Sequence, residues 1–182
     1  MRRGGRPQRL RVFLGGEGAS ENSYGVFLHR WMDTQRRDRH LDCEDLRGGD
    51  PLAVIEVAIE RIVIKERNHG AYAMRAVLLD SDGLGKQVDR DSQMYLLAAR
   101  HKLRLIWQRP CHEGFLLRHL EGYENENPPT TADAQLRLAA AWPEYHKAMT
   151  ASDLARKLSS GNIMRARQVV TEFDDLLSDL GL

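Results

Sequence analysis

Apolar residues before residue 110 fall into short runs, and these runs predict strands. Residues 12–14, 74–80 and 103–107 are mostly apolar, and residues 40–46 alternate between apolar and polar side chains. Runs of this length are too short for buried helices and are typical of strands enclosed in a sheet. The pattern therefore predicts four strands in this part of the chain.

Between these runs, apolar side chains recur three and four residues apart, as they do on one face of a helix. Ser20 is a good N-cap residue, and Asp50-Pro51 combines a cap with proline at the first helical position. The apolar positions of the three expected helices are Tyr24, Phe27, Leu28 and Trp31; Ile55, Ala58, Ile59 and Ile62; and Met94, Leu97 and Ala98.

The alternation of strands and helices predicts an α/β fold, with a parallel sheet that has helices on both faces. The segment YENENPPTTAD breaks this alternation and reads as a linker, and helical patterns follow it. The chain therefore divides into a flexible basic arm at 1–9, an α/β domain at 10–122 and a helical C-terminal extension at 123–182.

Composition and charge are those of an ordinary soluble globular protein. Of the 182 residues, 42% are hydrophobic and 29% are charged, and the net charge is +1, which does not indicate a wholly cationic nucleic-acid coat. The chain has no apolar run of the roughly 20 residues that a membrane span needs, and no secretory signal pattern. The two cysteines, Cys43 and Cys111, fit neither a disulfide framework nor a zinc site. These features favour a cytoplasmic protein.

The N-terminal segment MRRGGRPQR concentrates positive charge, with four arginines among glycines and a proline. Such a segment predicts a flexible cationic arm. It is either a tail that contacts phosphate groups or a terminus without a binding role.

Acidic residues follow two of the expected strands. Glu17 comes after the first strand, and Asp80 and Asp82 come after the third, where Gly83 and Gly85 allow the backbone to turn. In an open parallel sheet, ligands bind outside the carboxyl ends of the strands, where the strand order reverses. We therefore expect these carboxylates to lie near one another.

Carboxylates that converge without basic partners repel one another, and a hard divalent cation is the usual counter-charge. Magnesium would leave coordination positions open for phosphate oxygens, which favours metal-assisted hydrolysis of a phosphodiester. Two alternatives stay open. Asp80 and Asp82 can simply form an Asx-type turn after the strand, and sugar-nucleotide transferases also bind a metal through such a D-x-D pair.

The acidic motifs also resemble a known domain. Glu17 with the glycine after it, and the sequence DSDGLG that begins at Asp80, resemble the Toprim domain of topoisomerases, bacterial primases, recombination mediators and OLD-type nucleases. More closely, EGASENSYGVF resembles the E-G-x-T-E…Y-F opening of the RloB-like family. WQRPCHEGFLLRHLEG and WPEYHK are similar to that family's N-P-C-F-E-x-W-L-L-x-H-F segment and its Y-x-K element. The resemblance spans residues 11–147.

This resemblance implies a Toprim-type sheet in which Glu17, Asp80 and Asp82 bind Mg²⁺ or Mn²⁺ and act in catalysis. It also implies that Glu21 and Glu113 are supporting acids, Glu21 at the metal and Glu113 in catalysis. RloB-like proteins are usually linked to restriction or phage-defence loci, often beside an ATPase. The resemblance therefore implies a nucleic-acid substrate, DNA or RNA, and an ATPase partner.

Each further candidate has a plainer alternative. Lys86 and Arg109 could contact a transition-state phosphate, or be solvated cations. His112 could act as an acid or base, or be an ordinary turn histidine. Glu21 could instead stabilise a helix N-terminus through the macrodipole, and Glu113 could lie at a helix start.

Together these patterns predict a metal-dependent nuclease that acts in phage defence or nucleic-acid processing. One alternative is a non-catalytic Toprim module that binds an ATPase or nucleic acid. Another is a phosphoryl- or glycosyl-transfer enzyme built on the D-x-D pair. A homo-oligomer is compatible with each, and no membrane association is expected.

Overall fold

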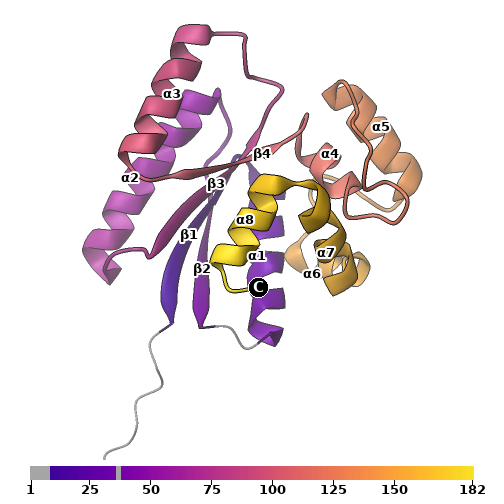
Figure 1. Ribbon diagram of the computed structural model, residues 1–182, viewed down its shortest axis with the longest axis horizontal. Helices are drawn as coiled ribbons and strands as arrows, with labels where there is room; N and C mark the ends of the chain where they lie inside the picture. Colours follow the sequence, from indigo (N-terminus) through magenta and orange to yellow (C-terminus); the bar gives the residue numbers. More distant parts are fainter. Residues whose placement is uncertain (1–8, 36–37) are drawn as a thin grey trace, which may run out of the picture.

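The strands form where the apolar runs predict them. The structure, a computed structural model, describes residues 9–35 and 38–182, so the expected arm at 1–9 lies almost wholly outside the described residues. Within them the chain forms four strands (Figure 1): β1 (Leu10–Gly16), β2 (Arg39–Asp45), β3 (Met74–Asp80) and β4 (Arg104–Gln108).

The described residues also form eight helices, of which the first two show how local sequence sets their starts. Asp50 Oδ1 accepts hydrogen bonds from the N–H groups of Leu52 and Ala53, as a cap before proline predicts. The expected cap at Ser20 is wrong, because Gly18 is the N-cap and the helix begins one residue before Ser20. The helices are α1 (Ala19–Thr34), α2 (Pro51–His69), α3 (Val88–Arg100), α4 (His112–Leu117), α5 (Thr131–Ala141), α6 (Ala151–Lys157), α7 (Ser160–Val169) and α8 (Thr171–Asp179).

The four strands form one sheet in the order β2-β1-β3-β4, and every neighbouring pair is parallel. β1 therefore lies inside the sheet, with β2 on one side and β3 on the other. The chain crosses in opposite directions to reach these two neighbours, so the strand order reverses between β1 and β3. The predicted α/β class with a parallel sheet is confirmed.

Helices cover both faces of the sheet (Figure 1). On one face, α2 and α3 bury a core that includes Phe13, Val77 and Leu79. On the other face, α1 and α4 pack over Leu14 and Leu78. Neighbouring positions of one strand point to opposite faces, which is why β1 and β3 read as continuous apolar runs.

The C-terminal extension is helical, as predicted, and it shares the core of the α1 face. Leu138, Phe173 and Leu177 belong to the same buried cluster as the strand residues Leu14 and Leu78. Helix α5 contacts α4, α6 contacts α1, and α8 contacts β4. Because its apolar surface is buried against the sheet domain, the extension is part of one folded body.

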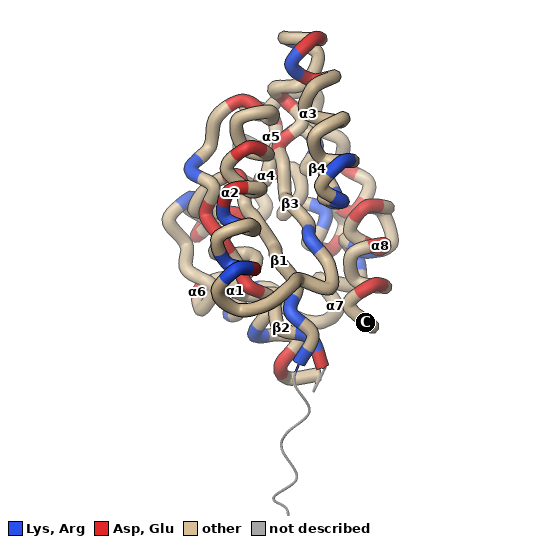
Figure 2. Tube along the Cα trace, turned by 90° about the vertical axis from the view of Figure 1, so that its left-hand side faces the viewer, with Lys and Arg blue, Asp and Glu red and all other residues tan. Residues whose placement is uncertain are grey.

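Positive and negative residues are interspersed over α2 and α3 (Figure 2), whereas α8 carries acidic residues only. This agrees with the balanced composition. No helix of the described residues has the length and apolar character needed to cross a membrane.

Candidate functional site

The carboxyl ends of β1 and β3 are hydrogen-bonded neighbours in the sheet. Gly16 of β1 is in register with Leu78 of β3, so Glu17, which follows β1, lies beside Asp80, which ends β3. This is the position at which the strand order reverses. Parallel α/β sheets bind ligands at such a position.

Glu17 is held against β3 at both its backbone and its side chain. Its N–H donates to the carbonyl oxygen of Leu78 at 3.2 Å. Its Oε2 accepts a hydrogen bond from the backbone N–H of Asp80 at 2.9 Å. The structure thus brings together two acids that are separated by 63 positions in the chain.

The glycine before Glu17 allows α1 to begin directly over the end of β1. A Cβ atom at Gly16 would lie 2.6 Å from the backbone nitrogen of Asn22 and 2.7 Å from Cβ of Glu21. These separations are shorter than any contact that a real Cβ tolerates, so only glycine fits. Gly16 therefore sets the close approach that carries Glu21 toward Glu17 and Asp80.

Glu21 is at the third position of α1, and its side chain caps the start of the helix by bonding back to the N-cap residue Gly18. Its Oε2 accepts a hydrogen bond from the N–H of Gly18 at 3.1 Å, and only 7% of the residue is exposed. Glu21 thus lies in the first turn of α1, as the macrodipole alternative expects, and its bond to Gly18 N–H is an additional contact that was not predicted. Its other carboxylate oxygen has no hydrogen bond of its own among the described residues.

The loop after β3 turns away sharply and is anchored on the segment after β4. The N–H groups of Ser81 and Asp82 both donate to the carbonyl oxygen of Pro110 at 3.0 Å. Gly85 has a φ of 80°, which favours glycine, as expected. Gly83 also lies in this turn, as expected, and a Cβ added there would be 3.4 Å from the ring of Pro51.

Asp82 is exposed and points toward the C-terminal extension. Its Oδ2 accepts a hydrogen bond from Thr131 Oγ1 at 2.6 Å, at the first position of α5. Sequence reasoning missed Thr131 because this contact depends on how the extension folds back. Thr130 and Thr131, which follow two prolines, indicate a helix start. Nothing in this local sequence predicts a contact with the acidic loop.

Burial and mutual repulsion raise the free energy of the ionised carboxylates and so raise their pKa values. Burial raises the pKa of Asp80 to about 9, with further contributions from the negative charges of Glu21, Glu17, Asp82 and Glu113. Burial likewise raises the pKa of Glu17 to about 6, against the favourable hydrogen bond from Asp80 N–H. Asp80 Oδ1 is buried and has no hydrogen-bond partner among the residues that the structure describes. The neighbouring charges that most affect Glu17 and Asp80 are therefore all negative.

The acids open onto a cavity that also carries a cation. Glu17, Asp80, Asp82 and Lys86 all line this cavity, whose volume is about 270 Å³. The start of α2 forms the opposite wall through Asp50 and Pro51. Lys86 thus lies in the same cavity as the acids, which is the position that the predicted contact with a phosphate group requires.

Glu113 lies in a second group of polar residues beside the acids. It is buried, and its Oε2 accepts a hydrogen bond from Cys111 Sγ at 3.2 Å. Its Oε1 is 3.5 Å from Nζ of Lys147. Burial raises the pKa of the nearby Tyr145 hydroxyl, and the charge of Glu113 adds to this effect. The WPEYHK segment thus reaches the edge of the acidic site.

His112 and Arg109 make contacts that were not predicted for either of their alternatives. His112 is buried at the start of α4, its Nδ1 is 2.9 Å from Gln108 Nε2, and burial lowers its pKa. Its ring is therefore enclosed in the core at the start of α4. Arg109 forms an ion pair with Glu172 of α8 at 2.7 Å, so its charge is directed toward the extension.

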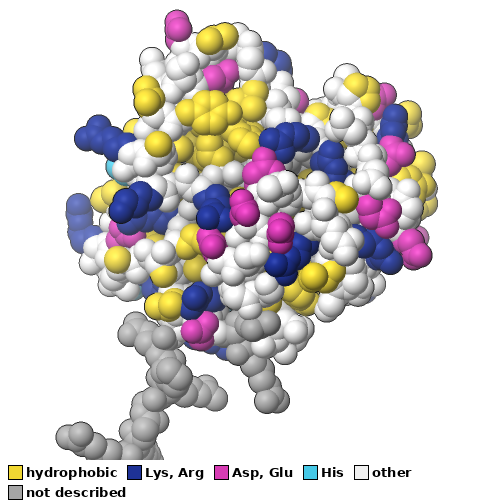
Figure 3. Space-filling view, in the orientation of Figure 1, with side chains coloured by type: hydrophobic (Ala, Val, Ile, Leu, Met, Phe, Trp, Pro, Cys, Tyr) yellow, Lys and Arg dark blue, Asp and Glu magenta, His cyan; other side chains and the backbone are white. Residues whose placement is uncertain are grey.

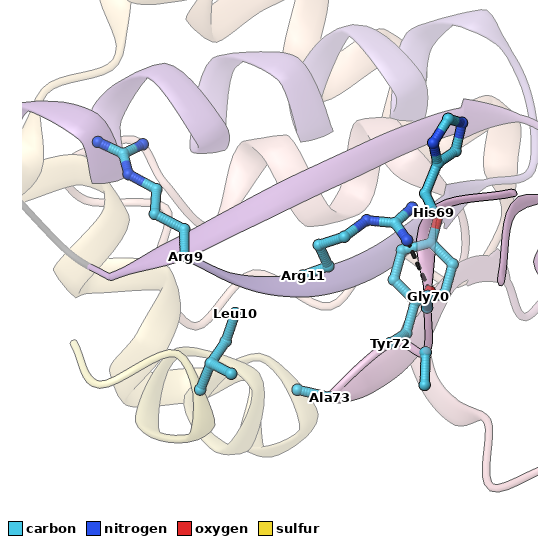
Figure 4. Close-up of a pocket in the computed structure, with 8 residues that line it drawn as sticks. Arg9, Leu10, Arg11, His69, Gly70, Tyr72 and Ala73 are labelled. Carbon is cyan, nitrogen blue, oxygen red and sulfur yellow. Dashed lines mark hydrogen bonds between the residues drawn. The ribbon is translucent and has the colours of Figure 1, made fainter. Parts of the chain in front are cut away.

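A larger cavity, of about 440 Å³, lies at the opposite end of the strands, near Arg9, Arg11 and His69 (Figure 4). Its arginines are already paired. Arg11 donates to the carbonyl oxygen of Gly70 at 2.7 Å and to Asp42 at 3.0 Å, and Arg9 pairs with Asp33. This cavity therefore presents no unpaired arginine for a ligand.

The acidic residues fit a divalent cation by chemistry but do not form a complete cage. Among the residues that the structure describes, no three His, Cys, Asp or Glu side chains are placed to bind one ion together. The donor set is nevertheless all oxygen, and Asp80 Oδ1 is an unsatisfied buried acceptor. Hard cations prefer such oxygen donors.

Comparisons with protein-family models, curated proteins and solved structures give no match to this chain.

Proposed function

We propose that this chain is a metal-dependent, Toprim-like nuclease that hydrolyses phosphodiester bonds in phage defence or nucleic-acid processing. One observation carries the proposal. Glu17 and Asp80 are hydrogen-bonded at the point where strand order reverses, and Asp80 Oδ1 is buried there without a partner. Repulsion among carboxylates at a ligand-binding edge is what a divalent cation relieves.

Glu17, Asp80 and Asp82 would hold Mg²⁺ or Mn²⁺, and Glu21 would support them from the first turn of α1. A bound cation would supply charge stabilisation and an activated water for attack on phosphorus. Without a cation, the Asp80 carboxyl retains its proton at neutral pH, because its pKa is about 9. The backbone bond from Asp80 N–H meanwhile fixes the orientation of Glu17.

Lys86 and Glu113 would act on either side of these acids. Lys86 lines the same cavity as Glu17 and Asp80, and its ammonium group would contact a non-bridging phosphate oxygen. Glu113 is buried and bonded to Cys111 and Lys147. We assign it the role of orienting Lys147 toward the nucleic-acid backbone.

The resemblance to the RloB-like family also supports this proposal. The four resembling segments come from distant parts of the chain, yet Glu17, Asp80, Glu113 and Lys147 lie at one edge of the sheet. In that family setting, the partner would be an ATPase encoded nearby, and the substrate would be DNA or RNA.

A second candidate is a non-catalytic Toprim module that binds an ATPase or nucleic acid. The observation that favours it is the engagement of the outer acids within the chain. Asp82 is bonded to Thr131 and Glu113 is paired with Lys147, and no three acids converge as ligands within the described residues. A module that only docks a partner would keep these contacts in its working state.

Cleavage assays separate the two candidates. The purified chain is incubated with plasmid DNA and with tRNA, with Mg²⁺, with Mn²⁺ and with chelator. The nuclease proposal expects cation-dependent cleavage that Asp80→Asn and Glu17→Gln abolish, while Glu60→Gln, a change at an exposed acid of α2, cleaves normally. Cleavage by the double variant at the parent rate would refute the site. Cation-dependent binding without cleavage would favour the docking module.

A further inference from the structure

Strand β4 forms an open edge of the sheet. Within the described residues it pairs with β3 alone, because the strand order ends at β4. The carbonyl oxygen of Gln108 accepts a hydrogen bond from Ser81, so the backbone groups of Gln108 point toward β3. Backbone direction alternates along a strand, and the N–H and C=O groups of Leu105 and Trp107 therefore point outward. Unpaired groups of this kind are a template for another strand.

An apolar surface adjoins this open edge. Figure 3 shows a patch of hydrophobic side chains over α3 and β4. Tyr95 lies over Trp107 with ring centroids 6.1 Å apart, and Tyr95 is 47% exposed. Val88 and Leu96 on the same helix are 69% and 72% exposed. An apolar patch beside an unpaired strand marks an interaction surface.

We propose that this surface binds a second copy of the chain, with the two β4 strands paired antiparallel about a two-fold axis at Ile106. The outward-facing residues are placed symmetrically about that axis, because Leu105 and Trp107 flank Ile106. Leu105 then lies opposite Trp107 of the other copy, and each such pair exchanges two backbone hydrogen bonds. The same residues meet from both sides, as a two-fold interface requires.

Charges at the rim do not oppose this arrangement. Arg104 pairs with Asp179 at 2.6 Å near the start of β4, and Arg109 pairs with Glu172 at 2.7 Å just past its end, so each arginine is already balanced within its own copy. With the axis at Ile106, Arg104 lies opposite Gln108 of the other copy. No like charges therefore lie directly opposite within β4.

The pairing has a consequence for the acidic sites. The carboxyl ends of the two sheets point in opposite directions when their edge strands run antiparallel. Each copy therefore keeps its own set of Glu17, Asp80 and Asp82, and the two sites face away from each other. On the α3 side, Tyr95 of one copy meets Tyr95 of the other across the two-fold axis.

The experiment is a mass measurement by light scattering over a concentration series of the full chain. The proposal expects a parent of twice the protomer mass. Tyr95→Lys places charge in the apolar patch, and Leu105→Pro removes an outward N–H without breaking the ladder to β3. Both variants are expected to have the protomer mass. The control Leu136→Lys, at a 72% exposed site on α5, is expected to stay dimeric.

Thermal unfolding followed by circular dichroism checks that each variant is folded. If Leu105→Pro does not fold, Tyr95→Lys decides alone, because its side chain is half exposed. A parent of protomer mass at every concentration overturns the proposal. So does a folded Tyr95→Lys variant that stays as dimeric as the parent, since this would place the interface elsewhere.

Discussion

The carboxylate of Glu17 accepts a hydrogen bond from the backbone N–H of Asp80 at 2.9 Å, which ties the end of β1 to the end of β3. This bond orients Glu17, but it leaves the Asp80 carboxylate without a donor on Oδ1. The same contact thus satisfies one acid and places a second acid in a buried position beside it. The pH dependence of folding follows from this arrangement.

The first prediction concerns the stability of the cation-free protein. The pKa of Asp80 is raised from 3.8 to about 9, so its neutral form favours folding below pH 4, and this contribution is lost as pH rises toward 9. Glu17, raised from 4.5 to about 6, loses its contribution over a narrower range. In chelator at pH 8, Asp80→Asn should therefore be more stable than the parent by about 1–3 kcal/mol.

Urea unfolding at several pH values measures this difference. The advantage of Asp80→Asn should shrink toward zero near pH 4, where the parent carboxyl is neutral in both states. Glu60→Gln serves as the control and should follow the parent at every pH. An Asp80→Asn advantage that does not change with pH would show that Asp80 is ionised in the folded protein.

A second prediction, which rests on the proposed function, concerns cation binding. An ion that binds only the folded chain stabilises it, by about 2.7 kcal/mol when present at 100 times its Kd. Mg²⁺ or Mn²⁺ should therefore raise the Tm of the parent and leave the Tm of Asp80→Asn unchanged.

Cation binding should also release protons. Asp80 carries its proton at pH 7 without a cation, because its pKa is about 9, and it must lose that proton to act as a ligand. Calorimetric titration at pH 7 in two buffers with different ionisation enthalpies measures the number released. About one proton per ion is expected for a single Asp80 carboxyl. Binding with no buffer dependence would exclude Asp80 as a ligand.

A third prediction concerns the ion pair between Lys147 and Glu113. The Glu113 side chain is only 4% exposed and that of Lys147 is 67% exposed, at 3.5 Å. Lys147→Met leaves a buried carboxylate with Cys111 as its remaining hydrogen-bond donor, so a loss of about 1–2 kcal/mol is expected. Glu113→Gln should cost less, because a neutral amide needs no counter-charge.

A double-mutant cycle measures the coupling between these two residues. The Lys147→Met substitution should cost little in the Glu113→Gln background, so the two free energies should not add. Strict additivity would show that the pair contributes nothing to stability. Lys157→Met, on the exposed end of α6, is the matched control.

The fold was more predictable from the sequence than the site. Continuous apolar runs and the Asp50-Pro51 start depend on local sequence, and the structure has the strands and α2 where these signals place them. The acids at the ends of β1 and β3 could also be placed near each other, because parallel strands bring their carboxyl ends to one edge. Local sequence patterns were therefore sufficient to predict the strands and α2, and to predict that these acids lie near each other.

Contacts made by the extension could not be predicted in this way. The bond from Thr131 to Asp82 and the ion pair from Lys147 to Glu113 join residues far apart in sequence. They depend on how α5 to α8 pack over the α1 face. The end of β1 is a separate case, because the apolar run predicted a strand at 12–14, whereas the structure continues β1 through Gly16. Gly16 is needed at this position because the start of α1 packs directly over it.

The last prediction tests that reason. A Cβ at position 16 would lie 2.6 Å from the backbone nitrogen of Asn22, and no side-chain rotation can relieve a clash with backbone. Gly16→Ala should therefore cost about 3 kcal/mol, at the upper end of overpacking effects. It should also separate the start of α1 from β1, which would loosen the bond between Glu17 and Asp80.

Gly161→Ala is the control, because an added Cβ there meets only Ser159 Oγ at 3.6 Å. It lies in the first turn of α7 and should be neutral or slightly stabilising, by up to about 1 kcal/mol. Urea unfolding of the two variants gives both free energies. Equal stabilities would mean that α1 can shift away from β1 without loss, and that the glycine is not needed to build the site.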